Sequence, residues 1–170
     1  TTMALLQQGT AVIGIDINGE KLNAMKETHG AMFEGIKADL GNEPSIAKCC
    51  ATLGPIDILI NNVGVLTTAK FLDTPLSDLR RTMALNLESA YLMSQHLIPG
   101  MKARGQGRII NISSFAGRSG GVLAGTAYSL SKAAMIGLTF CLAREFGPSG
   151  ISVNAVAPAP VATPMPIMLR

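Results

Sequence analysis

Aromatic and charged side chains are scarce in this sequence of 170 residues, which contains no tryptophan. Aromatic residues make up 4% and charged residues 15%, whereas 48% of the residues are hydrophobic. A chain so poor in charge and so rich in apolar side chains is neither a disordered tail nor a basic arm that coats nucleic acid. The densest basic cluster, at Lys102, Arg104 and Arg108, has no stacking aromatics beside it. We therefore expect a folded globular protein that does not bind nucleic acid.

Cysteine is also rare. The three cysteines, Cys49, Cys50 and Cys141, lack the spacing of a zinc site and are odd in number, so we expect neither a metal site nor a disulfide framework. This usage fits a reducing compartment and predicts a cytoplasmic protein. The longest uncharged run, residues 146–169, contains five prolines and is excluded as a membrane-spanning helix. The start of the chain has no basic segment before an apolar one, so we expect no signal peptide and no membrane association.

Strand-like and helix-like patterns alternate along the chain. Runs rich in β-branched residues predict strands at Thr10–Asp16, Met32–Ala38, Ile56–Ile60, Arg108–Ser113 and Ile151–Ala157. Helical periodicity predicts helices at Thr1–Gly9, Lys21–His29, Pro44–Leu53, Pro75–Lys102 and Ala127–Phe146, with Asn42 and Thr74 as N-caps. The strands are largely apolar, as in parallel sheets that helices cover on both faces. The order predicts an α/β fold with one doubly wound parallel sheet and helices on both faces.

The first predicted strand ends in an acidic residue, Asp16. In a dinucleotide-binding unit such an acid follows a glycine-rich turn by about 20 residues and hydrogen-bonds the adenosine ribose. Only 15 residues precede Asp16, so we expect this chain to lack the first strand and the glycine loop of that unit. The carboxylate favours NAD over NADP because it repels a 2′-phosphate. An aspartate that only stabilises a strand-end turn is the alternative.

Tyr128 and Lys132 are four residues apart in a helical pattern, so their side chains share one face. An ammonium close to a phenol stabilises the phenolate, which lets the phenol exchange a proton at neutral pH. The same spacing also occurs in an amphipathic helix whose tyrosine packs and whose lysine is solvated. Spacing alone leaves both interpretations open.

Polar residues follow two of the predicted strands, at the sheet edge where ligands bind in such folds. Ser113 and Ser114 end one strand, and a hydroxyl there can hydrogen-bond a substrate carbonyl. Asn61 and Asn62 end another, where an amide can meet a sugar hydroxyl. Both pairs are equally ordinary turn signals. Asn86 lies inside a predicted helix, where asparagine has poor propensity, so its presence requires a reason.

Taken in order, these segments resemble the short-chain dehydrogenase/reductase family over residues 9–163. Asn61-Asn62-Val63-Gly64 is similar to the family's Asn-Asn-Ala-Gly motif, and Tyr128-Ser-Leu-Ser-Lys132 matches its Tyr-x-x-x-Lys signature. The resemblance implies a Rossmann-type fold, so we expect residues 1–170 to form a single domain of that type, truncated at both ends. It also implies an oxidoreductase that transfers a hydride between NAD(H) and a carbonyl compound or secondary alcohol, with NADP less favoured.

The resemblance also assigns roles to individual residues. It implies that Tyr128 is the general acid/base, that Lys132 activates it and binds the nicotinamide ribose, and that Ser114 steadies the substrate oxygen. It implies that Asn86 anchors a water that relays protons to Lys132. The further cofactor contacts that it implies are Asp16, Ile17, Asp39, Leu40, Asn62, Val63, Gly64, Pro158, Val161 and Thr163. With the apolar surface of the two longest predicted helices, it predicts a homo-oligomer, either a dimer or a tetramer.

Three features depart from the family pattern. Ser114 lies about one position further from Tyr128 than is usual, which leaves open whether Ser113 or Ser114 faces the site. Val63 replaces the motif's alanine, and Ala159 replaces a glycine in the segment that resembles the family's Pro-Gly-x-x-x-Thr. Both add bulk close to the expected cofactor. They support the alternative function, a non-catalytic dinucleotide-binding or assembly module that keeps the fold.

Overall fold

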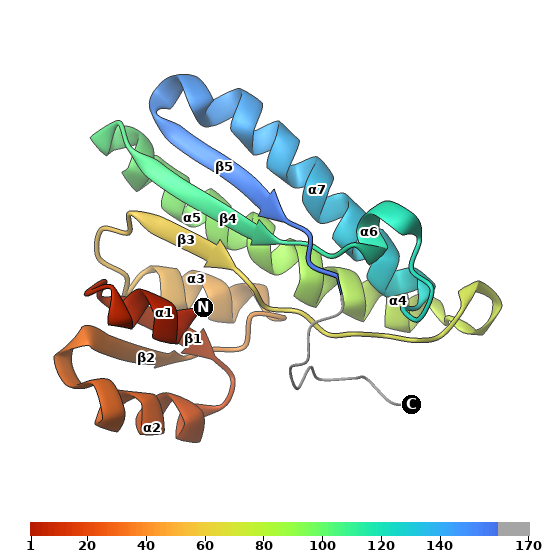
Figure 1. The fold of residues 1–170 in the computed structure, drawn as a ribbon, viewed down its shortest axis with the longest axis horizontal. Helices are drawn as coiled ribbons and strands as arrows, with labels where there is room; N and C mark the ends of the chain where they lie inside the picture. The colour runs from red at the N-terminus through yellow and green to blue at the C-terminus, as the bar shows by residue number, and fades with distance from the viewer. Residues whose placement is uncertain (160–170) are drawn as a thin grey trace. The chain divides into compact units, whose positions relative to one another are not determined.

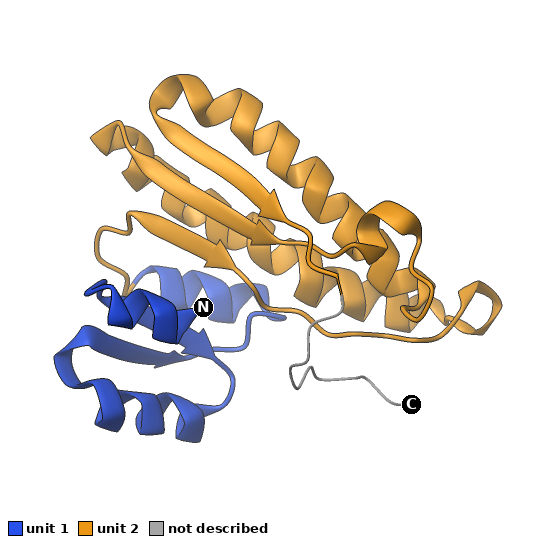
Figure 2. Ribbon diagram, viewed as in Figure 1, with its two compact units in different colours: residues 1–51 blue, residues 52–170 orange. Residues whose placement is uncertain are grey.

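The computed structural model describes residues 1–159 of the chain (Figure 1). The chain divides into two compact units, residues 1–51 and the residues from 52 onward (Figure 2). Each unit consists of parallel strands with helices packed against them, as the alternating patterns predict. That residues 1–170 form one domain stays a prediction.

The first unit contains a two-stranded parallel sheet. Its elements are α1 (Thr2–Gln7), β1 (Val12–Asp16), α2 (Gly19–His29), η1 (Gly30–Met32), β2 (Phe33–Lys37) and α3 (Glu43–Cys50). Helix α2 packs on both strands. It approaches β2 closely because Gly35 has no side chain: a Cβ there would lie only 2.8 Å from the Cβ of Leu22. Asn18 and Asn42 cap α2 and α3, each accepting a hydrogen bond from a backbone N–H three residues ahead. The predicted cap at Asn42 is thus confirmed.

The second unit contains a three-stranded parallel sheet in the order β3-β4-β5. Its strands are β3 (Ile58–Asn61), β4 (Gly107–Ile112) and β5 (Ile151–Val156). Its helices are η2 (Phe71–Asp73), α4 (Leu76–Met83), η3 (Ala84–Glu88), α5 (Ser89–Arg104), α6 (Ala116–Ser119), α7 (Thr126–Phe146) and η4 (Gly147–Ser149). The arrowheads of its strands point to one end of the unit, where α6 and the start of α7 lie (Figure 1).

A buried chain of polar side chains joins this sheet to its helices. Asn61 and Asn111 are register partners on β3 and β4, and the Nδ2 of Asn61 donates to the Oδ1 of Asn111 at 2.8 Å. Asn61 also donates to Ser94 of α5, and Asn111 donates to Thr139 of α7 at 2.9 Å. Helices α5 and α7 therefore pack on the same face of the sheet. Satisfied buried amides of this kind fix the register of elements that apolar contacts alone would leave free to slide.

The structure has two parallel sheets, one in each unit, where the sequence predicts a single sheet. Taken separately, the orders β2-β1 and β3-β4-β5 each match a stretch of the doubly wound order 3-2-1-4-5-6. The connections and parallel pairing are those of the doubly wound fold.

The helix predicted at Pro75–Lys102 is not uniform. It consists of α4, one π-helical segment (η3) and α5, and the π segment contains Asn86. The predicted N-cap is also wrong, because the helix begins at Leu76 and the hydroxyl of Thr74 instead donates to the carbonyls of Ala69 and Lys70. A π segment changes which side chains share a face, and such segments are frequent at functional sites.

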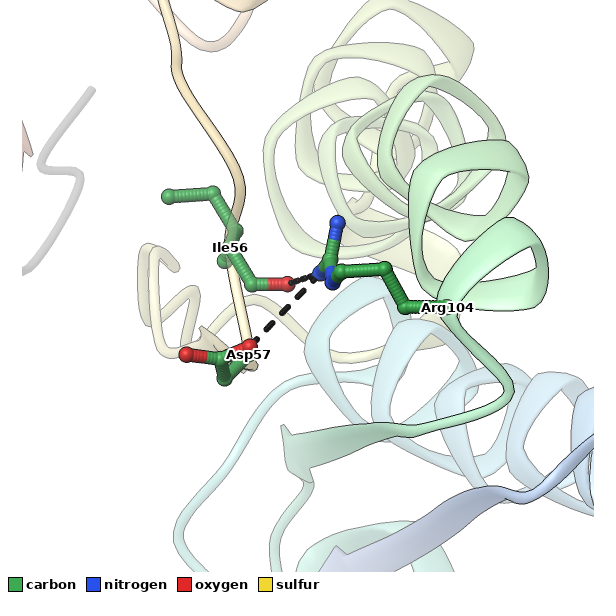
Figure 3. Close-up of polar contacts among 3 residues, drawn as sticks. All are labelled: Ile56, Asp57 and Arg104. Carbon is green, nitrogen blue, oxygen red and sulfur yellow. Dashed lines mark hydrogen bonds and ion pairs between the residues drawn. The ribbon is translucent and has the colours of Figure 1, made fainter.

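A polar contact fixes the far end of the second unit. The guanidinium of Arg104, in the last turn of α5, donates to the carbonyl of Ile56 at 2.6 Å and lies 3.7 Å from the carboxylate of Asp57 (Figure 3). This contact ties the end of α5 to the start of β3. Arg104 thus has the structural role that its position near a helix end suggests, at the edge opposite to the predicted site.

Helix α7 is the most apolar long helix. Among the described residues, the segment Thr126–Ser149 alone is long and apolar enough to cross a membrane by length and composition. A core helix has the same properties, and α7 packs on β4, β5 and α4. These contacts account for the apolar side chains on its buried face. The helix carries Tyr128 and Lys132.

Candidate functional site

The carboxyl ends of β3 and β4 and the first turns of α7 bring together several of the predicted catalytic residues. Tyr128 and Lys132 are buried, with 7% and 2% of their surfaces exposed. The Nζ of Lys132 lies 5.9 Å from the centroid of the Tyr128 ring. Of the two interpretations that the spacing left open, the solvated surface lysine is wrong, because Lys132 points into the unit.

Lys132 is held at the end of β4. Its Nζ donates to the carbonyl of Ile112 at 2.7 Å, and the hydroxyl of Ser113 donates to its backbone carbonyl, also at 2.7 Å. Burial lowers the pKa of Lys132 to about 8, because the ammonium loses hydration and no carboxylate among residues 1–159 forms an ion pair with it. Lys132 therefore loses its proton at a lower pH than an exposed lysine.

Gly64, from the Asn-Asn-Val-Gly motif, lies next to the Lys132 ammonium and the Asn86 amide. A Cβ at Gly64 would lie 3.2 Å from the Oδ1 of Asn86 and 3.3 Å from the Nζ of Lys132. The glycine therefore brings the backbone after β3 close to the ammonium. Its neighbours in the motif differ in exposure: Asn61 is buried in the polar chain under the sheet, Asn62 is exposed and Val63 is half-buried.

Asn86 has a fully buried side chain that joins three segments. Its Oδ1 accepts from the backbone N–H of Val65 at 2.8 Å, and its Nδ2 donates to the carbonyl of Val65 and to the hydroxyl of Ser131, both at 3.0 Å. Ser131 in turn donates to the carbonyl of Tyr128 at 2.7 Å. The side chain thus holds the loop after β3 against the first turns of α7, and its oxygen keeps one further lone pair.

The two serines at the end of β4 have different environments. Ser113 is buried, and its hydroxyl is committed to the carbonyl of Lys132. Ser114 is half-buried, and its Oγ accepts from the backbone N–H of Ala116 at 3.2 Å, which leaves its O–H able to donate. This difference favours Ser114 as the serine that faces a substrate.

The predicted adenosine contacts belong to the first unit, at the ends of β1 and β2. Asp16 is exposed and accepts from the backbone N–H of Asn18 at 2.8 Å, and the adjacent Ile17 is 63% exposed. Asp39 accepts from the backbone N–H of Gly41 at 2.8 Å, and Leu40 is half-buried. Both aspartates therefore stabilise local turns, and each keeps a second carboxylate oxygen that could accept from a ligand.

The last predicted cofactor segment is described only in part. The carbonyl of Pro158 accepts from the backbone N–H of Phe115 at 2.9 Å, which joins the chain after β5 to the chain after β4. Val161 and Thr163 lie outside the described residues.

Sequence reasoning missed Val65 and Ser131. They form three hydrogen bonds with Asn86, and Ser131 lies inside the Tyr128–Lys132 signature. The poor helix propensity of Asn86 indicated that this amide has a partner. Val65 lies in the loop after β3 and Ser131 lies on α7. No local sequence pattern identifies partners so far along the chain.

Comparisons with known proteins identify the family of the chain. A family model described as short chain dehydrogenase matches residues 1–170. Dehydrogenase/reductase SDR family member 6 of Aquarana catesbeiana is 38% identical over 162 residues, which are 95% of this chain and 65% of that protein. Oxidoreductase UcpA of Salmonella typhimurium is 37% identical over 165 residues, which are 94% of this chain and 63% of that protein.

Solved structures give the same result. A short-chain dehydrogenase from Streptomyces avermitilis matches with a TM-score of 0.88 and 32% identity, over 95% of this chain and 62% of that one. The closed form of a serine dehydrogenase complexed with NADP⁺ matches with a TM-score of 0.86 and 27% identity, over 93% of this chain and 65% of that one. The chain spans just under two thirds of the length of these relatives. It belongs to the short-chain dehydrogenase/reductase family.

Proposed function

We propose that the protein is an oxidoreductase that transfers a hydride between a nicotinamide dinucleotide and a carbonyl compound or secondary alcohol, with Tyr128 as general acid/base. The observation that carries the proposal is the buried ammonium of Lys132, 5.9 Å from the Tyr128 ring centroid and without a carboxylate partner among the described residues. A buried, unpaired cation next to a phenol costs stability, and stabilising a phenolate is the chemistry that such an arrangement supports.

Each side chain of the site has a role in the proposed reaction. During reduction the Tyr128 hydroxyl donates its proton to the substrate oxygen as negative charge develops there, and during oxidation the phenolate accepts the hydroxyl proton. The O–H of Ser114 donates a hydrogen bond to the same oxygen. Asn86 keeps the loop after β3 and the first turns of α7 in fixed positions through Val65 and Ser131. When bound, the nicotinamide ring supplies or accepts the hydride.

The residues next to Lys132 fit the sugar of such a cofactor. An ammonium has three N–H donors, and among residues 1–159 the Nζ of Lys132 has one hydrogen-bond partner, the carbonyl of Ile112. The remaining donors suit vicinal ribose hydroxyls. Gly64 keeps the adjacent backbone free of a side chain that would crowd this position. Asn62, exposed two residues earlier, is proposed to contact the same cofactor, together with Val63.

We further propose NAD rather than NADP as the cofactor, because Asp16 is an exposed carboxylate that accepts from a ribose 2′-hydroxyl and repels a 2′-phosphate. The related serine dehydrogenase complexed with NADP⁺ shows that a relative takes the phosphorylated form. The preference of this protein therefore rests on Asp16 itself, with Ile17, Asp39 and Leu40 as further adenosine contacts.

A homo-oligomer, dimer or tetramer, is the proposed assembly. Large apolar side chains are exposed on the two long helices of the second unit: Tyr91 on α5 is 50% exposed, and Leu130 and Phe140 on α7 are 50% and 71% exposed. Covering such side chains favours association of helix faces. Light scattering at micromolar concentration tests this, and a monomeric mass would contradict it. A cytoplasmic location stays a prediction from cysteine usage.

The decisive experiment uses the two tyrosines as test and control. We expect Tyr128→Phe, in the protein expressed from its complete coding sequence, to lower kcat/KM for a carbonyl substrate by about 10²–10⁴ while leaving NADH binding in place. Tyr91→Phe, which keeps the aromatic ring on the face of α5 that we propose for association, should leave kcat/KM within about twofold. A panel of ketones is screened by nicotinamide absorbance. NADH binding without turnover of any of them would favour the non-catalytic module instead.

A further inference from the structure

The N-terminus of α7 has an unusual cap. Its N-cap residue is Gly125, which has no side chain to accept from the first N–H groups of the helix. Instead, the carbonyl of Thr67 accepts from the N–H of Gly125 at 2.7 Å, and the carbonyl of Ala69 accepts from the N–H of Thr126 at 3.1 Å. The helix that carries Tyr128 is therefore capped by the backbone of a segment almost 60 residues earlier in the chain.

Lys70 extends this contact in the opposite direction. Its Nζ donates to the carbonyls of Val122 and Ala124, at 2.9 and 3.1 Å, in the loop that leads into α7. Figure 1 shows the two loops, one between β3 and α4 and one between α6 and α7, side by side at the same end of the unit. The four hydrogen bonds join residues 67–70 to residues 122–126, and only those from Lys70 come from a side chain.

The two loops fit together closely. A Cβ at Gly125 would lie 2.5 Å from the carbonyl oxygen of Ala69 and 2.8 Å from that of Thr67. The hydroxyl of Thr74 donates to the carbonyls of Ala69 and Lys70, which fixes the segment that bears Lys70. Small shifts of this segment are therefore transmitted directly to the start of α7.

Tyr128 and Lys132 differ in how they are anchored. Lys132 is held at the end of β4, where its carbonyl accepts from Ser113 and its Nζ donates to Ile112. Tyr128 is the third residue of α7, in a first turn whose leading N–H, that of Thr126, donates to the carbonyl of Ala69 in the capping segment. If that segment loosens, the first turn can fray and move the phenol while Lys132 stays in place.

We propose that Lys70 is a positioning residue, which fixes the first turn of α7 and so keeps the Tyr128 phenol in register with Lys132. The proposal rests on the proposed function of Tyr128. In the proposed reaction Lys70 touches no reacting atom. Lys70 acts through the hydrogen bonds that its Nζ donates to the carbonyls of Val122 and Ala124. Loss of its ammonium should therefore change the setting of Tyr128 without unfolding the unit.

The test follows amide hydrogen exchange in the first turn of α7, which mass spectrometry measures in a peptide spanning residues 122–130 of the protein expressed from its complete coding sequence. We expect Lys70→Met to speed exchange of the N–H groups of residues 125–128 about tenfold and to lower kcat about tenfold, with KM for NADH within about twofold. Lys70→Arg, which can donate to both carbonyls, should restore both values. Lys26→Met, at an exposed lysine of α2, is the matched control.

The outcomes separate this proposal from the proposed function. Unchanged exchange of these N–H groups in Lys70→Met overturns the positioning role whatever the activity, and so does faster exchange without a loss of kcat, or failure of Lys70→Arg to restore both. A global loss of stability would also speed exchange in the peptide that contains β4, which serves as the internal control. If Tyr128→Phe is as active as the parent, the proposed function fails, and the exchange series still decides whether Lys70 holds the first turn.

Discussion

The predicted catalytic residues and the predicted adenosine contacts are held in opposite ways. In the second unit Tyr128, Lys132 and Asn86 are buried, and partners on other elements hold Lys132 and Asn86. In the first unit Asp16 and Asp39 are exposed, and each accepts from a backbone N–H two residues ahead. Buried groups connect distant segments, whereas exposed groups stabilise only their own turn.

This difference changes what a substitution does. A buried hydrogen-bonded side chain affects stability and geometry together, because its removal leaves partners unpaired in a dry environment. An exposed turn carboxylate can be replaced with little loss of stability, so its effect on a ligand is measurable separately. Four predictions, ordered by the free energy at stake, test whether this division holds.

Lys132→Met should have the largest effect. We expect kcat/KM to fall by about 10²–10³, because the ammonium that stabilises the phenolate of Tyr128 is lost while the volume of the side chain is nearly kept. Steady-state kinetics at pH 7 measures this. Lys102→Met, at an exposed lysine in the last turn of α5, is the control and should stay within about twofold. If Lys132→Met is nearly as active as the parent, Lys132 does not stabilise the phenolate in the reaction.

The second prediction concerns stability against pH. Burial lowers the pKa of Lys132 to about 8 from 10.5, so between these two values the unfolded chain holds a proton that the folded chain lacks. The free energy of unfolding of the parent relative to Lys132→Met should therefore rise with pH across this window, by up to about 3 kcal/mol. Below pH 8 the cost of burying the charge is present in full. Urea titrations of both proteins from pH 7 to about 10.5 check this, and a constant difference would contradict it.

Asn111→Ala should destabilise the second unit by about 2 kcal/mol. The substitution removes the acceptor of Asn61 and the donor to Thr139 in a fully buried position. Chemical denaturation gives the change in the free energy of unfolding. Asn154→Ala, at an exposed position on the neighbouring strand β5, should change it by less than about 0.5 kcal/mol. Equal effects of the two substitutions would mean that the buried chain of amides contributes no net stability.

The elements of the fold could be predicted because their signals are local. Runs rich in β-branched residues located the five strands of residues 1–159 to within about two residues, and Asn42 identified a helix start by capping chemistry. Thr74 was wrongly predicted as an N-cap because its hydroxyl can also donate to carbonyls that precede it in the chain, here those of Ala69 and Lys70. The short helix α6 was missed because its residues, Ala116–Ser119, form a single turn without periodicity.

The contacts that build the site could not be predicted, because they join distant segments. The π-helical segment contains Asn86, whose amide binds Val65, 21 residues away. The contacts of Lys70 with Val122 and Ala124 span more than 50 residues. Side-chain chemistry says that an amide or an ammonium needs partners, but only the fold decides which ones it meets.

Asp16→Asn should have the smallest effect on stability and still a measurable one on cofactor choice. Asparagine keeps the oxygen that accepts from the N–H of Asn18, so the free energy of unfolding should change by less than about 0.5 kcal/mol. The lost negative charge no longer repels a 2′-phosphate, so the ratio of the NADPH and NADH dissociation constants should fall about tenfold. Asp39→Asn, which keeps the equivalent turn at Gly41, should leave that ratio unchanged. If both substitutions leave it unchanged, Asp16 is a turn residue only, and the exposed carboxylates of the first unit carry no cofactor preference.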